Sequence, residues 1–251
     1  MKKNIEIIAM IYKSLGFLDF ITDQLKSPKC KANGWDVGVR VVANDASEKV
    51  VNRLKAGDIP YSIYNDPKPE DFYLNRVYRC WNYGAQSSEY DNICFVNSDM
   101  AFTEGWLENL LKHHDGVNIP CSRLVESGRI PVATTRHGVP QNFGTTPKEF
   151  NQLALETFAK EISEDRTESS GLFMPCVFEK LKFITAGMYP EGNIFYAAGD
   201  SFEVGRPNDV TPYASGAAFF FNDILKKRFG MKHITAFDSI VYHIQEGEKA
   251  E

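Results

Sequence analysis

The sequence lacks the signatures of disulfide-rich, secreted and membrane-spanning proteins. Its cysteines are odd in number and scattered along the chain: Cys30, Cys80, Cys94, Cys121 and Cys176. Because none of them forms a C-x-x-C pair, neither a disulfide framework nor a zinc knuckle is predicted. No apolar run approaches the roughly 20 residues that span a bilayer. Glu6 interrupts the apolar residues near the N-terminus, which indicates a strand rather than a signal peptide. We therefore expect a cytoplasmic protein without a membrane span.

An excess of positive charge is also lacking. The chain carries 28 basic and 33 acidic residues, for a net charge of −5, which argues against a broadly basic surface for nucleic acid or anionic lipid. With 251 residues, of which 43% are hydrophobic, the chain is long enough to bury the core of one large α/β domain. No repeat, low-complexity tract or linker divides it, so we predict a single domain over residues 1–251.

Strand-like and helical segments alternate in the first part of the chain. Strands are predicted for residues 5–12, 37–43, 61–65 and 93–96, and helices for residues 15–25, around 50–54 and 75–85. Alternating strands and helices with short links are typical of parallel, doubly wound sheets. The pattern predicts an α/β, Rossmann-like fold with a mostly parallel central sheet flanked by helices.

The second part of the chain is less regular in pattern. Thr103 is expected to cap a helix that carries Trp106. Proline and glycine recur so often between residues 116 and 144 that we expect an irregular segment covering the site. Residues 161–170 are almost entirely polar and are expected to form a mobile loop.

Further helices and strands are expected towards the C-terminus. Thr146, Pro147 and Glu149 match a capping box, and the helix that follows is expected to bury Phe150, Leu153, Ala154 and Phe158. The remaining expected elements are a short helix from Pro175 to Leu181, a helix over residues 213–229 ended by Gly230, and closing strands at residues 234–236 and 239–242.

The strand at residues 93–96 ends abruptly in three polar residues, Asn97, Ser98 and Asp99. Ligands of open α/β sheets gather beyond the carboxyl ends of such strands, so Asp99 is the first candidate for chemistry. The alternative is an ordinary turn and helix start, because Asn, Ser and Asp all favour such places.

Several motifs occur together in a recognisable order. They are Asn44-Asp45-Ala46-Ser47 after the second strand, Asn82-Tyr83-Gly84 on a helix, Asn97-Ser98-Asp99, Gly187-Met188-Tyr189-Pro190-Glu191, Gly199-Asp200 and the late Tyr242-His243. In this order the chain resembles the family 2 nucleotide-sugar glycosyltransferases of the GT-A fold. Asn97 stands where that family's D-x-D motif has its first carboxylate, and Gly199 replaces the first residue of its acidic pair.

The resemblance implies a divalent metal ion held by Asp99 and His243. A carboxylate oxygen and an imidazole nitrogen together suit Mn²⁺, so Mn²⁺ is favoured and Mg²⁺ is the alternative. Without the resemblance, His243 would be read as an ordinary surface histidine near the C-terminus.

The resemblance also implies contacts to a nucleotide-sugar donor. Asp45 is expected to accept a hydrogen bond from the N3–H of uracil, because a carboxylate is an acceptor only, and this favours a UDP-sugar; its alternative role is to cap the following helix. Arg79 and Asn82 are expected to approach the diphosphate or the base, although Arg79 could equally be a surface charge. Asn97 and Ser98 complete the expected donor contacts.

Asp200 is the expected general base of the transfer. It would remove a proton from an acceptor hydroxyl that attacks the anomeric carbon opposite the leaving diphosphate, so that one displacement inverts the configuration. The alternative for Asp200 is a helix cap. Glu191, Glu203 and Asp209 are the other candidate bases.

The sequence therefore predicts a metal-dependent, inverting glycosyltransferase. Residues 1–115 would form its nucleotide-sugar-binding half, and residues 116–251 its acceptor-binding half. The acceptor would be a glycan or another hydroxyl compound. Two alternatives stay open: a non-catalytic glycan- or nucleotide-binding protein on the same fold, and a phage-type enzyme acting on modified DNA bases, which would use basic residues in the 123–137 region.

Overall fold

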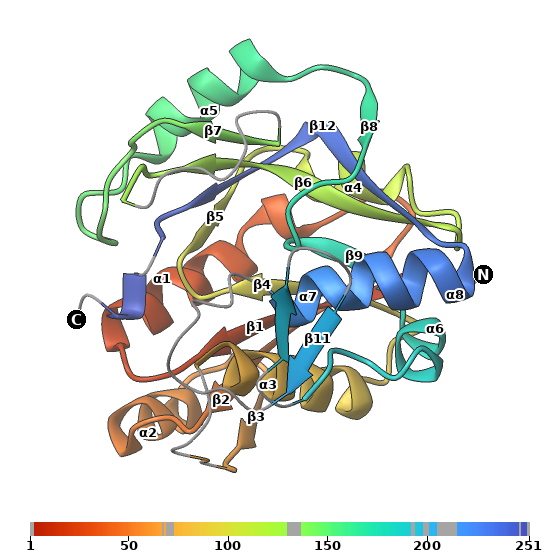
Figure 1. Ribbon diagram of the computed structural model, residues 1–251. Coiled ribbons are helices and arrows are strands. Elements are labelled where there is room, and N and C mark those ends of the chain that lie inside the picture. The colour runs from red at the N-terminus through yellow and green to blue at the C-terminus, as the bar shows by residue number, and fades with distance from the viewer. Residues whose placement is uncertain are drawn as a thin grey trace.

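The computed structural model describes residues 3–66, 68, 73–129, 137–191, 194–197, 201–204, 215–245 and 247–249. Its centre is a ten-stranded sheet in which eight strands follow the order β3-β2-β1-β4-β9-β6-β12-β5, while β7 pairs with β6 and β8 with β12. Strands β10 and β11 form a separate antiparallel pair. Helices lie on both faces of the large sheet (Figure 1). The predicted α/β fold with a mostly parallel sheet is confirmed.

The first half of the chain follows the predicted alternation closely. Its elements are β1 (Asn4–Ile11), α1 (Leu15–Lys26), the short 3-10 helix η1 (Pro28–Cys30), β2 (Asp36–Asn44), α2 (Glu48–Ala56), β3 (Tyr61–Tyr64), α3 (Tyr73–Ser87), β4 (Asn92–Asn97), β5 (Met100–Phe102) and α4 (Trp106–Leu111). Strands β1 to β4 are parallel to one another where they pair. Their polar carboxyl ends therefore meet at one edge of the sheet.

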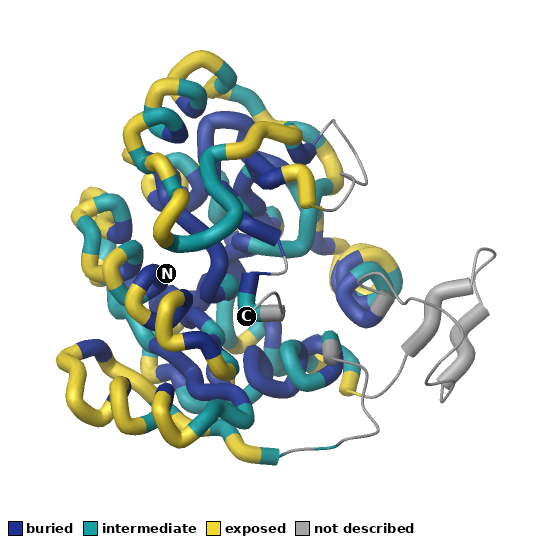
Figure 2. Tube along the Cα trace, turned by 90° about the vertical axis from the view of Figure 1, so that its left-hand side faces the viewer, coloured by how far each residue is buried: buried dark blue, intermediate teal, exposed yellow. Residues whose placement is uncertain are grey.

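Two hydrophobic cores form because successive strand residues point to opposite faces of the sheet. On β1, Ile5 and Ile7 pack with α1, α2, α4 and α5 in the first core, whereas Ile8 packs with α3, α6 and η2 in the second core. Figure 2 shows the buried strands enclosed by helices whose outer sides are exposed. The sheet is thus buried on both faces, as expected for strands that read as nearly continuous apolar runs.

The second half of the chain contains the remaining elements. They are β6 (Asn118–Glu126), β7 (Gly138–Pro140), α5 (Gln152–Ile162), β8 (Thr167–Ser169), β9 (Cys176–Glu179), α6 (Lys180–Thr185), β10 (Ile194–Ala197), β11 (Ser201–Val204), α7 (Ser215–Phe219), the π-helical η2 (Phe220–Lys226), α8 (Lys227–Phe229), β12 (Lys232–His243) and η3 (Gly247–Lys249). None of the described helices is both long and apolar enough to cross a lipid bilayer.

The expectation of an irregular segment between residues 116 and 144 is wrong, because this part of the chain contains the inner strand β6. Pro120 is the third residue of that strand, and it lies beside Ile234 in the parallel pair with β12. Gly128, with φ of 84°, follows the strand. Proline and glycine here mark the ends of a strand rather than a loop.

Two further local expectations also fail. Residues 161–170 contain β8, which pairs with β12 through its backbone, and the Arg166 guanidinium lies 3.6 Å from the centre of the Phe237 ring. Polar side chains therefore did not prevent strand pairing. The chain after Pro175 forms β9 rather than a helix, because the Pro175 carbonyl accepts from Ser122 N at 3.1 Å and draws the segment alongside β6.

Thr103 does not cap α4. Its hydroxyl donates instead to the Ile240 carbonyl at 2.7 Å, while Gly105, in the left-handed region, precedes the helix. At the C-terminus, the helical stretch expected to end at Gly230 does end there, with Gly230 at φ 65°. The two expected closing strands are one strand, β12, with an irregularity in its register between Ala236 and Ile240.

The capping turn at Thr146 forms, but α5 begins later than predicted. Thr146 Oγ1 accepts from Glu149 N at 3.3 Å, and Asn151 then caps the helix by accepting from Ala154 N. The later start rotates the buried face, so that Leu155 is fully buried while Leu153 is 78% exposed. The predicted burial of Leu153 is therefore wrong.

Alanine substitutions at Leu153 and Leu155 test this helical phase. Leu155→Ala is expected to lower the free energy of unfolding by about 2 to 5 kcal/mol, because it leaves a cavity in the core. Leu153→Ala, the matched control, is expected to change it by less than about 0.5 kcal/mol. Urea unfolding followed by circular dichroism measures both, and equal effects would contradict the observed phase.

Candidate functional site

A cavity of about 350 Å³ opens where the carboxyl ends of β1, β2, β4 and β12 approach one another. Polar and aromatic side chains from these strand ends, from α3 and from the C-terminal turn line it, among them Tyr12, Asn44, Arg76, Asp99, His243 and Glu248. This position beyond the strand ends is where open α/β sheets bind ligands. The cavity is therefore the candidate site, and Asn97, Ser98 and Asp99 all lie in its wall.

Asp99 and His243 face each other in this wall. The Asp99 Oδ1 and His243 Nε2 atoms are 3.4 Å apart, and Gly247 N donates to Asp99 Oδ2 at 3.1 Å. The antiparallel pairing of β5 with β12 sets His243 opposite Met100, next to Asp99. Burial raises the pKa of Asp99, but the charge of His243 and its hydrogen bond outweigh burial and lower it.

Glu126 is the third member of this cluster. Its Oε2 atom lies 3.1 Å from His243 Nδ1, because the parallel pairing of β6 with β12 places the two residues side by side. Burial lowers the pKa of His243, but Asp99 and Glu126 outweigh it and raise the pKa to about 10. The reading of His243 as a surface histidine is wrong, since its side chain is 20% exposed and held by two carboxylates.

The donor atoms of this cluster suit a divalent cation. In a neutral His243 that donates Nδ1–H to Glu126, the Nε2 lone pair faces Asp99, which is the arrangement that orients many metal-binding histidines. Neighbouring ligands of an octahedral ion with bonds of about 2.1 Å lie about 3 Å apart, close to the separation between Asp99 Oδ1 and His243 Nε2. One carboxylate and one imidazole favour Mn²⁺ over Ca²⁺ or Mg²⁺.

The C-terminal turn closes one side of the cavity. Tyr12 N, at the end of β1, donates to Glu248 Oε2 at 2.9 Å. A Cβ atom at Gly247 would lie 2.8 Å from the Asp99 Cβ atom, so only glycine allows the turn to pack this closely on Asp99. The sequence indicated no more than a polar tail here, and neither Gly247 nor Glu248 was expected in the site.

The end of β2 contributes Asn44 rather than Asp45 to the cavity wall. Asp45 has a φ of 47°, and its Oδ1 atom accepts from Asp66 N at 2.9 Å. Ser47, not Asp45, caps α2 by accepting from Val50 N, so the helix-cap alternative for Asp45 is wrong. A role of Asp45 in base recognition stays a prediction.

Helix α3 contributes Arg76, which sequence reasoning missed. Arg76 lines the cavity, and its guanidinium carbon lies 5.5 Å from the centre of the Tyr12 ring. Arg79, one turn further along and on the same side of the helix, is only 5% exposed. The surface-charge alternative for Arg79 is therefore wrong, while its expected contact to the donor stays a prediction.

Asn82 fixes the segment that precedes Glu191. Its Nδ2 atom donates to the Tyr189 carbonyl at 2.8 Å and to Glu191 Oε1 at 3.2 Å, and its Oδ1 atom accepts from Tyr189 N at 3.0 Å. Gly84 lets α3 approach β1, because an added Cβ would lie 2.9 Å from Ile8 Cγ2. The Asn-x-Gly motif thus has a packing role, and the expected donor contact of Asn82 stays a prediction.

The acceptor side of the site is only partly described. Asp200, Gly199 and Asp209 lie outside the described residues, and Glu203 belongs to β11. Glu191, one of the other candidate bases, is held by Asn82. The assignment of the general base therefore stays a prediction.

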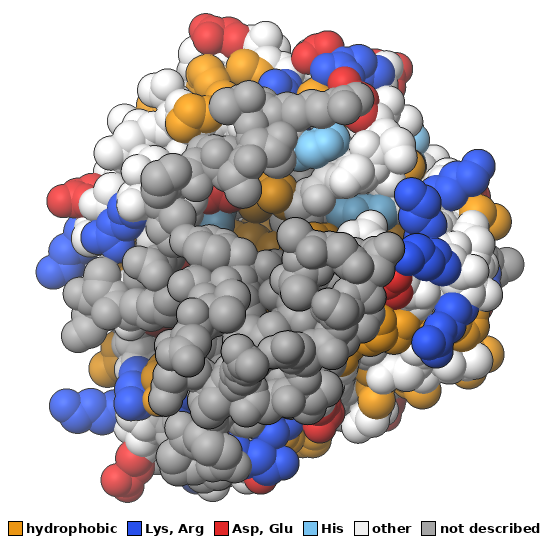
Figure 3. All heavy atoms as spheres, in the orientation of Figure 1, with side chains coloured by type: hydrophobic (Ala, Val, Ile, Leu, Met, Phe, Trp, Pro, Cys, Tyr) orange, Lys and Arg blue, Asp and Glu red, His pale blue; other side chains and the backbone are white. Residues whose placement is uncertain are grey.

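In the described part of the 123–137 region, Arg123 is turned into the fold and Arg129 is exposed, and the alternative of a DNA-binding groove stays a prediction. The Arg123 guanidinium donates to the Ile162 carbonyl at 3.0 Å and lies 4.8 Å from the centre of the Phe237 ring, so it is already engaged within the fold. On the face drawn in Figure 3, acidic side chains lie among the basic side chains of the described residues.

Three solved structures with a similar fold are distant in sequence. The chain superposes on GalNAc-T7, solved with UDP, GalNAc and Mn²⁺, with a TM-score of 0.56 and 11% identity over 96% of this chain and 44% of that one. It superposes on the mannosyltransferase PcManGT of Pyrobaculum calidifontis, solved with GDP-Man and Mn²⁺, with a TM-score of 0.51 and 13% identity over 97% and 57%. For residues 1–349 of S. aureus TarS, the values are 0.51, 13%, 97% and 60%.

These likenesses establish the fold. The predicted GT-A fold is confirmed, whereas the resemblance to family 2 in particular stays a prediction. The sequence matches no family model and no curated protein. The chain spans between 44% and 60% of the length of the three solved proteins, which therefore contain segments without a counterpart here.

Proposed function

We propose that the chain is a metal-dependent, inverting glycosyltransferase that moves a hexosyl or pentosyl group from a nucleotide sugar to an acceptor hydroxyl. The observation that carries this proposal is the Asp99–His243–Glu126 cluster, which lies in the wall of a cavity at the carboxyl ends of the parallel strands. The GT-A fold and the Mn²⁺ found in two structural neighbours support it. A protein that bound only a metal ion would not need a cavity of this size beside the ion-binding side chains.

Each residue of the cluster has a distinct task in the proposed reaction. Bound Mn²⁺ would stabilise the negative charge that grows on the leaving diphosphate. Asp99 and His243 would hold the ion, and Glu126 would keep the His243 ring oriented by accepting from Nδ1–H. Burial of the cluster strengthens these interactions, because few water molecules compete with them.

The nucleotide would occupy the part of the cavity beside Tyr12 and Arg76. Arg76 supplies a positive charge that suits a phosphate. Asn97 Oδ1 has no hydrogen-bond partner among the described residues, so it is available to accept from a ribose hydroxyl. A UDP-sugar remains the favoured donor, with Asp45 as acceptor for the uracil N3–H.

A screen of nucleotide sugars tests the proposal. Mn²⁺ together with a UDP-sugar is expected to raise the melting temperature, because a ligand that binds only the folded state stabilises it, and EDTA is expected to reverse the shift. Slow release of UDP is expected as water replaces the acceptor. Metal-dependent UDP binding without turnover across a broad acceptor panel would favour a non-catalytic binding protein, and stabilisation by GDP-sugars alone would contradict the UDP preference.

Glu126 is proposed as a positioning residue, and Glu126→Gln tests that role. Glutamine can still accept from His243 Nδ1 but lacks the negative charge, so the Mn²⁺ affinity is expected to fall by about 10- to 100-fold. Isothermal titration with Mn²⁺ measures the change. Glu164→Gln, at an exposed ion pair with Arg166, is the matched control, and equal affinities in both variants would contradict the role.

Mn²⁺ binding is expected to strengthen as the pH rises. The pKa of His243 is about 10 in the metal-free protein, so the ion must displace a proton, and the apparent affinity should rise about tenfold per pH unit below that value. Calorimetry in buffers with different ionisation enthalpies should detect about one proton released per ion bound. A pH-independent affinity would show that His243 is not a ligand.

A further inference from the structure

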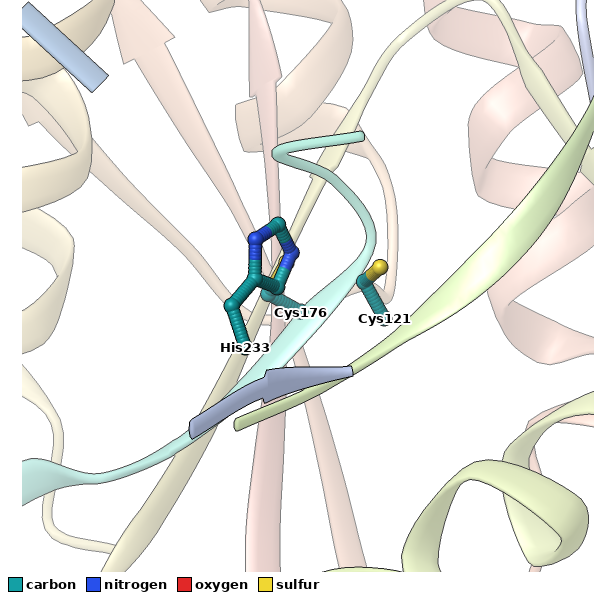
Figure 4. A group of neighbouring side chains, drawn as sticks. All are labelled: Cys121, Cys176 and His233. Atoms are coloured by element: carbon teal, nitrogen blue, oxygen red, sulfur yellow. The ribbon is translucent and has the colours of Figure 1, made fainter. Parts of the chain in front are cut away.

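Three metal-binding side chains meet in the interior, on strands that lie side by side. Cys121 is on β6, Cys176 on β9 and His233 on β12 (Figure 4), and these three strands are consecutive in the sheet. Cys121 and Cys176 lie directly opposite each other in the β6–β9 pair. Their sulfur atoms and a ring nitrogen of His233 all lie within 4.8 Å of one another. None of the three residues lines the cavity described above.

The spacing is close to that of a tetrahedral metal site. Zinc bonds of about 2.3 Å to sulfur and about 2.0 Å to nitrogen set neighbouring ligand atoms about 3.5 to 3.8 Å apart. Small side-chain rotations at Cys121 and Cys176 would close the remaining difference. The Leu172 carbonyl oxygen lies 3.0 Å from His233 Nε2 and 3.7 Å from Cys176 Sγ, and the Thr235 hydroxyl lies 3.4 Å from Cys121 Sγ. Either oxygen could supply a fourth ligand.

The groups around Cys121 distinguish it from Cys30 and Cys94. All five cysteines are buried, and burial raises the pKa of Cys30 to about 12 and also raises that of Cys94. At Cys121 burial acts in the same direction, but the hydrogen bond with Cys176 and the neighbouring His233 outweigh it, and the pKa falls below the usual range. Burial and the neighbouring Cys121 raise the pKa of Cys176.

We propose that Cys121, Cys176 and His233 form a structural Zn²⁺ site that ties β6, β9 and β12 together. Thiolate and imidazole ligands select Zn²⁺ over the harder Mn²⁺, so this site and the proposed catalytic site would hold different ions. The sequence does not show it, because each ligand comes from a separate strand rather than from a C-x-x-C motif.

The site would also stabilise one wall of the cavity. Residues Gly171 to Met174 run past the cluster, and Phe173 and Met174 line the cavity. The Phe173 ring stacks on His233, with ring centroids 6.0 Å apart, and a Cβ atom at Gly171 would collide with Cys121 Sγ. An ion that fixes His233 and the Leu172 carbonyl would therefore hold Phe173 in place.

Cobalt substitution of the full chain under reducing conditions tests the site. One Co²⁺ per metal-free chain is expected to produce a thiolate-to-cobalt charge-transfer absorption in the near ultraviolet, and Zn²⁺ is expected to abolish it. Cys176→Ser and His233→Gln should lose the band. Cys94→Ser, which changes a buried cysteine outside the cluster, should keep it. Asp99→Asn should also keep it, so that the result does not depend on the proposed transferase activity.

A second measurement does not rely on variants that could misfold. Zinc-edge X-ray absorption of the wild-type protein should show sulfur neighbours at about 2.3 Å. Absence of sulfur neighbours, or a cobalt band that survives in Cys176→Ser, would overturn the proposal. A mass lower by two hydrogen atoms, with the loss mapped to a Cys121–Cys176 disulfide, would also overturn it, because the two sulfur atoms would then be unavailable to a metal.

Discussion

Replacing Asp99 with asparagine is expected to lower the rate of Mn²⁺-dependent donor turnover by about 10³-fold, which corresponds to about 4 kcal/mol of lost transition-state stabilisation. The substitution removes one negative charge and keeps the size of the side chain. The amide oxygen of the new side chain could still accept from Gly247 N, which now donates to Asp99 Oδ2, so the C-terminal turn should stay in place. The loss would therefore reflect the missing metal ligand rather than a collapsed site.

Asp58→Asn is the matched control for this substitution. Asp58 is exposed and paired with Lys26 on the surface, so its replacement should leave turnover unchanged. Calorimetry should show weak Mn²⁺ binding in Asp99→Asn and normal binding in Asp58→Asn. Turnover at the wild-type rate in Asp99→Asn would remove the central residue from the proposed site, whatever the identity of the donor.

The sequence predicted the position of Asp99 at the end of a strand, because that position depends on local pattern alone. An apolar run that ends in polar residues reveals both the strand and its polar end, and β4 does end at Asn97. The strands β1 to β3 and their helices follow from the same local alternation of apolar and polar residues. Neighbouring parallel strands then bring their carboxyl ends together without further information.

Contacts that depend on register between distant strands could not be predicted in this way. Glu126 reaches His243 only because β6 pairs with β12 in one particular register, and a shift by one residue would turn its side chain to the other face. Pro120 had suggested that no strand existed there at all. The cluster of Cys121, Cys176 and His233 depends on the same strand order, so it too was invisible in the sequence.

The remaining differences concern which face of α5 is buried and which arginine of α3 lines the cavity. The capping turn at Thr146 was predicted correctly, yet the helix starts at Gln152, and a shift of a few residues exchanges Leu153 for Leu155 in the core. On α3, the sequence indicated Arg79 for donor binding, whereas Arg76 lines the cavity. The difference on α5 arises because 3.6 residues complete one helical turn, so an offset of two residues moves a side chain to another face.

Asp200→Asn is expected to lower turnover by about 10²- to 10⁴-fold, the usual contribution of a general base, while leaving donor binding intact. Asparagine cannot take the proton from the attacking hydroxyl or water, whereas the metal cluster and the nucleotide wall of the cavity are unchanged. Mn²⁺ and UDP-sugar should therefore raise the melting temperature of this variant as much as that of the wild type. Asp99→Asn, by contrast, should lose both turnover and metal-dependent stabilisation.

Glu191→Gln tests whether Asp200 or Glu191 is the general base. Glu191 Oε1 already accepts from Asn82 Nδ2 at 3.2 Å, and glutamine can keep that hydrogen bond, so turnover should change little if Asp200 is the base. A large loss in Glu191→Gln with normal turnover in Asp200→Asn would reverse the assignment. The anomeric configuration of the released sugar, read by NMR before it equilibrates, distinguishes the mechanisms: a single displacement assisted by one base must invert it, and retention would contradict both candidates.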